Sequence, residues 1–186
     1  MTTLWLALIL LFTPASVQGV DREQVDVTYY PASAVEVARY PAKSFHWGST
    51  PMVIVCNSAP VSKARVKKAM DLWRRMGYEL DGPLMNDSSH PCITPGGYSF
   101  GNIIIELNGQ DFPEPNAAIT RTYSRTATGE ILGVAIQIKE KWSKQERVLE
   151  HEFGHAMGWD HFSRKLHLMH PIHDFGGWDT YGLKGK

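Results

Sequence analysis

The sequence predicts one domain of the α/β or α+β class, in which a sheet packs against helices. Short apolar runs that suit buried strands occur at Met52–Val55 and Ile103–Leu107. Between them, after Ser62, apolar side chains recur at steps of three and four residues, as along one face of an amphipathic helix. A chain of 186 residues has room for one such domain with a genuine core and for short appendages.

The helix after Ser62 is expected to end at Gly77, because Ser is a favoured N-cap residue and Gly tolerates the backbone angles that end a helix. Its apolar positions are Val66, Ala69, Met70, Trp73 and Met76. Lysine and arginine fall elsewhere on it, a pattern that suits either solvent or nucleic acid. Solvent is favoured, because 19 Lys and Arg balance 19 Asp and Glu and no net field attracts nucleic acid.

The second half of the chain is expected to add strands. Asp81 to Gly97 is rich in turn-forming residues, and Asn108 to Gly129 combines a loop with a strand around Ala118–Ser124. Ile131 to Lys139 alternates, with Val134, Ile136 and Ile138 on one side and Ala135, Gln137 and Lys139 on the other. This alternation predicts a half-exposed strand at or near the edge of the sheet.

The N-terminal residues 1–19 resemble a secretory signal peptide. An apolar stretch, Leu4–Phe12, is followed by small residues at Val17 and Gly19. The alternative is an uncleaved membrane anchor, but the apolar run is shorter than the roughly 20 residues that a spanning helix needs. We therefore expect a secreted or extracytoplasmic protein, periplasmic or extracellular, without stable membrane insertion after signal removal. Residues 20–49 form an N-terminal extension of unassigned role, and residues 50–186 form the main domain.

The chain has two cysteines, Cys56 and Cys92, whose expected state depends on whether the protein is exported. An even count in an exported chain favours a disulfide between them, and the alternative is a pair of buried free thiols. Either arrangement leaves too few cysteines for a four-sulfur zinc site.

A cluster of metal-ligand residues lies on a second predicted helix. Ser143 and Glu146 form a capping-box pattern, so this helix is expected to run from Lys144 through Met157. His151 and His155 are one turn apart, so that both imidazoles can bind one ion. Glu152 projects beside them, within reach of a water at the same ion.

A third ligand is expected just after this helix. Gly158 suits a sharp turn at the helix end, and His161 follows three residues later with another ring nitrogen. Three protein ligands leave the fourth zinc position open, which is the catalytic arrangement and not the structural one. The pattern predicts one catalytic Zn²⁺ held by His151, His155 and His161, with Glu152 as general base.

The segment from His151 to His161, with the sequence HEFGHAMGWDH, resembles the extended zinc signature of the metzincin metallopeptidases. Downstream, Leu168-Met169-His170-Pro171 resembles their Met-turn, in a form closest to the matrixin-like type. The resemblance implies that Met169 is a packing floor beneath the metal and not a ligand. It is strong over Glu146 to Pro171, but no matrixin-like propeptide with a cysteine switch is recognisable in the sequence before the domain.

The resemblance also implies an architecture and a mode of substrate binding. A metzincin-like zincin has a twisted, mostly parallel sheet with an antiparallel edge strand, an active-site helix below it and a cleft between them. An extended polypeptide substrate would pair with the edge strand, for which Gly133–Ile138 is the candidate segment. A specificity pocket on the C-terminal side of the cleaved bond would have Val148, Pro171 and Ile172 near its wall.

The function expected from these features is that of a secreted zinc-dependent endopeptidase. The competing hypotheses are a non-catalytic zinc-binding module, against which Glu152 argues, and a metal-free interaction domain. His170, His173 and Tyr181 are candidate donors to a developing oxyanion, or else surface residues, and Asp160 could orient a ligand or stabilise a turn. Ca²⁺ is undecided, because Asp111, Glu114 and Asn116 suit either a calcium loop or an ordinary turn.

Overall fold

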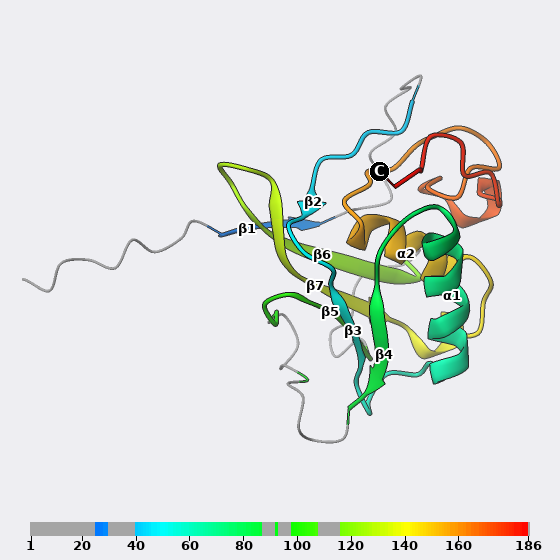
Figure 1. Cartoon of the computed structure of the whole chain (residues 1–186). Coiled ribbons are helices and arrows are strands. Elements are labelled where there is room, and N and C mark those ends of the chain that lie inside the picture. The colour runs from blue at the N-terminus through cyan, green and yellow to red at the C-terminus, as the bar shows by residue number, and fades with distance from the viewer. Residues whose placement is uncertain (1–24, 30–39, 87–91, 93–97, 108–115, 186) are drawn as a thin grey trace, which may run out of the picture.

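The computed structural model describes residues 25–29, 40–86, 92, 98–107 and 116–185. Within them lies a seven-stranded sheet in the order β1-β6-β7-β5-β3-β4, with β2 pairing onto β7 (Figure 1). The strands are β1 Val25–Tyr29, β2 His46–Trp47, β3 Met52–Val55, β4 Asp81–Met85, β5 Asn102–Leu107, β6 Ala118–Arg125 and β7 Glu130–Ile138. The α-helices are α1 Lys63–Arg75 and α2 Val148–Ala156, and short 3-10 helices span Glu140–Trp142 and His173–Phe175.

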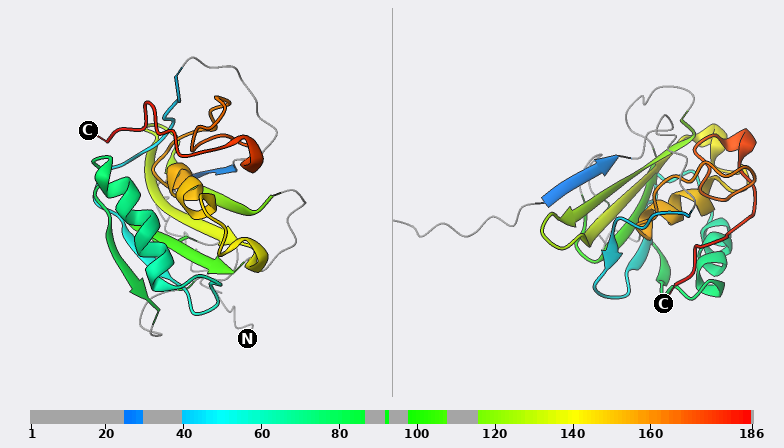
Figure 2. Two further views of the ribbon diagram at one scale, coloured as in Figure 1. Left: turned by 90° about the vertical axis from the view of Figure 1, so that its right-hand side faces the viewer. Right: turned by 90° about the horizontal axis from the view of Figure 1, so that it is seen from above.

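The sheet is mostly parallel, as expected for an α/β fold. Strands β2, β3, β4, β5 and β7 pair in parallel, whereas β6 is antiparallel to both β7 and β1. Both α-helices lie on the same face of the sheet (Figures 1 and 2). The main core therefore forms between that face and the two helices.

The first predicted helix is confirmed. The Ser62 hydroxyl accepts a hydrogen bond from the backbone N–H of Arg65, and Gly77 follows the helix with a φ of 95°. Its predicted apolar face is buried at Val66, Ala69, Met70 and Trp73. That face packs against the side of the sheet that carries Val53, Val55, Ile103, Ile105, Val134, Ile136 and Ile138.

The segment expected to be only turns contains a strand. Asp81–Met85 pairs in parallel with β3 and forms the outermost strand β4. This strand was not predicted because it contains Gly82 and Pro83, and both residue types are depleted in strands. Proline is tolerated here since an edge strand needs only half of its backbone N–H groups for pairing.

The predicted edge position of Ile131 to Lys139, and with it of the segment Gly133–Ile138, is wrong. Strand β7 lies inside the sheet between β6 and β5, and all residues from Ile131 to Ile138 are buried. The side of the strand predicted to face solvent is also covered. Gln137 on that side is fully buried, and its amide donates to the Glu106 carboxylate at 2.8 Å. A buried polar residue whose amide nitrogen bonds a partner distant in sequence was mistaken for a solvent-facing one.

The N-terminal extension contributes β1 and β2, while residues 1–19, predicted to be a signal peptide, lie outside the described part. In the part of the chain that the structure describes, no helix is long and apolar enough to cross a membrane. Cys56 and Cys92 form the expected disulfide.

We predict that removing this disulfide lowers the free energy of unfolding. It joins residues 36 positions apart, and the chain-entropy model gives about 3–4 kcal/mol for a loop of that size. The Cys56→Ala, Cys92→Ala double variant should show this loss in denaturant titrations, and the reduced natural protein should match it. Equal stability of the oxidised and reduced proteins would contradict the prediction.

Candidate metal centre

Helix α2 carries two of the predicted ligands but begins later than expected. It starts at Val148, and the residue before it, Arg147, has left-handed backbone angles with a φ of 68°. The Ser143 hydroxyl does not cap the helix; it donates to the Glu140 carbonyl at 2.7 Å and closes the preceding 3-10 turn. The predicted capping box is therefore wrong, while the helix end near Met157 is confirmed.

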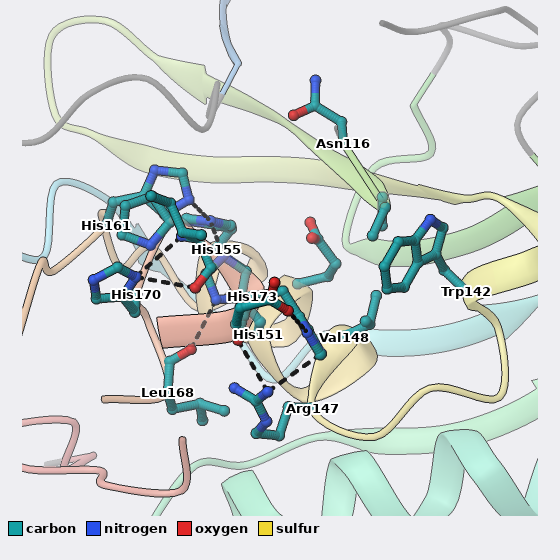
Figure 3. Close-up of a pocket in the computed structure, with 16 residues that line it drawn as sticks. Asn116, Trp142, Arg147, Val148, His151, His155, His161, Leu168, His170 and His173 are labelled. Carbon is teal, nitrogen blue, oxygen red and sulfur yellow. Dashed lines mark hydrogen bonds and ion pairs between the residues drawn. The ribbon is translucent and has the colours of Figure 1, made fainter. Parts of the chain in front are cut away.

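The structure brings the three predicted histidines together. The Nε2 atom of His155 lies 3.0 Å from Nε2 of His151 and 3.1 Å from Nε2 of His161. Figure 3 shows the three rings converging at one side of a pocket. No other group of three or more metal-ligand side chains of this kind occurs among the described residues.

Hydrogen bonds fix which nitrogens of two rings carry protons. His151 Nδ1 lies 2.8 Å from the Leu168 carbonyl, and His155 Nδ1 lies 2.7 Å from the Trp159 carbonyl. A carbonyl only accepts, so each Nδ1 carries the hydrogen and each neutral ring presents a bare lone pair on Nε2. Two lone pairs then face each other at 3.0 Å without a proton between them.

Protonation does not resolve this repulsion near neutral pH. Burial, as the main cause, lowers the pKa of His151 to about 4 and holds the pKa of His155 well below its usual range. Both rings are neutral at pH 7. A cation shared by the lone pairs is the remaining way to make the arrangement favourable.

The spacing of the nitrogens fits a single tetrahedral ion. Histidine nitrogens at about 2.0–2.1 Å from such an ion lie about 3.3 Å apart, close to the distances observed here. Imidazole ligands favour zinc and its neighbours in the first transition row over calcium or magnesium. The residues present therefore fit a transition-metal ion such as Zn²⁺.

The turn after α2 positions the third ligand and depends on Gly158. Its φ is 92°, and a Cβ atom there would overlap the backbone of Phe45. The Gly158 carbonyl also accepts a hydrogen bond from the Ser44 N–H at 2.9 Å, so the N-terminal extension holds the turn in place. Asp160 accepts from the Ser44 hydroxyl, which gives it a role in holding this turn and not in orienting a ligand ring.

Glu152 lies on the same helix, beside the ligands, and is buried. The Thr120 hydroxyl of β6 donates to its carboxylate at 2.6 Å. Burial raises the pKa of Glu152 to about 7, against the opposing effect of this hydrogen bond. A carboxyl group with such a pKa is suited to exchange protons at neutral pH.

Met169 forms a packing floor beneath α2. It is fully buried, and a Cβ atom at Gly154, between the two helical ligands, would overlap its sulfur. The backbone carbonyl of its neighbour Leu168 is the group that orients His151. This short segment thus supports the ligands both by packing and by hydrogen bonding.

Helix α2 is anchored to α1 and to the extension through its backbone and a buried ion pair. Arg65 donates to both oxygens of the Glu150 carboxylate, at 2.8 and 2.6 Å. The Trp73 indole donates to the Glu150 carbonyl, and the Trp47 indole donates to the Ala156 carbonyl. These bonds fix the depth and rotation of the helix that presents the ligands.

A pocket of about 220 Å³ adjoins the three histidines. Val148, Pro171 and Ile172 line it, as the resemblance predicted, and Trp142 lines it beside Val148 (Figure 3). Its polar end contains Arg147, which donates to the His173 carbonyl at 3.0 Å. The walls suit an apolar side chain.

Only some of the candidate oxyanion donors and calcium ligands that the structure describes lie near the three histidines. His170 and His173 line the pocket, but Tyr181 does not; its ring stacks on Tyr40. Of the possible calcium ligands, Asp111 and Glu114 lie outside the described residues, and Asn116 lines the pocket. No sequence pattern indicated Thr120 or the two orienting carbonyls, of Leu168 and Trp159, because only tertiary contacts identify them.

Comparison with protein-family models, with curated proteins and with solved structures finds no match for this chain.

We predict that Gly158→Ala weakens metal binding at the three histidines by about 10- to 100-fold, the usual effect of disturbing the groups that support metal ligands. The matched control is Gly101→Ala. Both glycines have a positive φ, but a Cβ at Gly101 meets no atom within 4 Å, so this change incurs only the left-handed backbone cost of about 1–2 kcal/mol. Competition with a chromophoric chelator measures both affinities. Equal affinities in the two variants would contradict the proposed role of the turn.

Proposed function

We propose that this chain is a zinc-dependent endopeptidase of the metzincin class, closest to the matrixin-like type. The observation that carries the proposal is the convergence of three imidazole lone pairs next to a buried glutamate and a pocket. His151, His155 and His161 would hold the ion. A bound zinc ion would polarise the scissile carbonyl and make water more acidic at neutral pH.

The protein's own residues supply the proton transfer. Glu152 would accept a proton from the attacking water and pass it to the departing amine, as a general base and then a general acid. The Thr120 hydroxyl holds the carboxylate in place from the neighbouring strand. His170 lines the pocket as well, but the amide of Ile172 donates to its Nδ1 at 3.1 Å, and its role here is to order the chain after Met169.

The strand order supports a corrected site for the substrate backbone. Strand β7 has neighbours on both sides, so a peptide cannot pair with it. Ala118–Thr120 of β6 pair with β7 on one side only within the described chain, and Ala118 borders the pocket. An extended polypeptide would pair along this edge and place one side chain in the pocket.

We further propose that the protein acts outside the cytoplasm. The Cys56–Cys92 disulfide favours an oxidising compartment, and residues 1–19 have the composition of a signal peptide.

The test of the proposed function separates metal binding from catalysis. Glu152→Gln keeps the shape of the side chain but removes its basicity, so zinc content and folding should persist while peptide hydrolysis falls by about a hundredfold or more. His161→Ala should lose zinc and activity together, with partial rescue at most by added zinc. Metal analysis and a quenched-peptide assay on both purified variants measure these effects.

Treating the natural protein with a chelator and then restoring zinc provides the control. Activity should disappear and return. Full activity of Glu152→Gln would show that the mechanism is wrong, and zinc binding without hydrolysis in the natural protein would favour a non-catalytic zinc module.

A further inference from the structure

The outer edge of β6 has two halves with different neighbours. The half made by Ala118–Thr120 lies beside the metal centre, since Thr120 bonds Glu152 and Ala118 borders the pocket. The half made by Arg121–Arg125 is covered by β1. Both halves belong to one continuous strand, so a ligand that pairs along its whole length must displace β1 (Figures 1 and 2).

The pairing of β1 is continuous and, among the described residues, reaches the position next to the metal centre. Five consecutive residues pair in antiparallel register, from Val25 opposite Arg125 to Tyr29 opposite Arg121. The next position along β6 is Thr120, the residue that holds Glu152. The last described residue of β1 is therefore paired one position along β6 from the residue that holds the proposed catalytic carboxylate.

The direction of β1 is that of an antiparallel substrate. A peptide that continued this ladder would lie opposite Thr120, then Ile119, then Ala118, and so would run past Glu152 toward the pocket. The residues that such a peptide carries before the cleaved bond would have to pair with Arg121–Arg125. Those are the positions that β1 already fills.

We propose that β1 competes with the substrate as a tethered strand. It occupies Arg121–Arg125 of β6, where the substrate residues before the cleaved bond would pair. This inference rests on the proposed peptidase function. Substrates with several residues before the cleaved bond bind only when β1 leaves β6, whereas substrates that engage only the pocket side bind with β1 in place. Because β1 is covalently attached, its effective concentration is of the order that short tethers give, about millimolar, and weak pairing suffices to compete.

Release of β1 would keep the other described strands of the sheet paired. Within the described sheet it is the outermost strand, with β6 as its neighbour on one side. Among the described strand pairings, its release would break the ladder with β6 and would leave β6 paired with β7 from Ala118 to Ser124.

Proline substitutions in the full chain test the proposal. Adjacent residues of an outermost strand direct their N–H groups to opposite sides, so one of Val27→Pro and Thr28→Pro removes a bond to β6 and the other serves as its matched control. For a peptide with several residues before the cleaved bond, the disruptive variant should lower KM by about three- to tenfold, as expected for one lost backbone hydrogen bond, with kcat unchanged. For a peptide with a single residue there, neither variant should change KM. Unchanged KM for the longer peptide in both variants would overturn the proposal.

A binding measurement keeps the inference independent of hydrolysis and of any folding defect in the proline variants. In the zinc-loaded Glu152→Gln protein with natural β1, the longer peptide should raise hydrogen exchange at residues 25–29, and the shorter peptide should not. If the natural protein proves to have no peptidase activity, exchange that still rises in this way in the variant would retain the competing strand and refute only the proposed function. Binding of the longer peptide with no change at residues 25–29 would refute the competing strand.

Discussion

The candidate metal centre depends on one electrostatic constraint, the repulsion between the imidazole lone pairs that His151 and His155 direct at each other. Their Nδ1 hydrogens are committed to backbone carbonyls, and burial keeps both rings neutral. Two unprotonated nitrogens 3.0 Å apart repel unless a cation lies between them. The geometry of the three-histidine cluster is therefore favourable only when the cluster binds a cation.

The rest of the fold holds this arrangement against its own repulsion. The helix that carries both rings is fixed by the buried Arg65–Glu150 pair and by two tryptophan indoles that donate to its carbonyls. Beneath it, Met169 packs against Gly154, and beyond it Gly158 turns the chain against Phe45 to present His161. A rigid support of this kind reduces the reorganisation that metal binding would otherwise require.

Local patterns predicted the parts of the protein that local physics determines. The spacing of His151, His155 and His161, the helix capped by Ser62, and the apolar runs of β3 and β5 all depend on residues close in sequence. Features that depend on distant partners were missed or mistaken. Gln137 suggested an exposed edge because its partner Glu106 is 31 residues away, and Thr120 gave no sign that it would hold Glu152. The strand order, which decides which edge is open, likewise follows from tertiary pairing and not from any single segment.

The central claim is that the three histidine nitrogens share one ion, and X-ray absorption spectroscopy of the zinc-loaded protein tests it most directly. The account predicts one zinc per chain with three imidazole nitrogens at about 2.0–2.1 Å and one further light atom in a four-coordinate shell. A shell that contains sulfur, a shell of six oxygens, or the absence of stoichiometric zinc would contradict it.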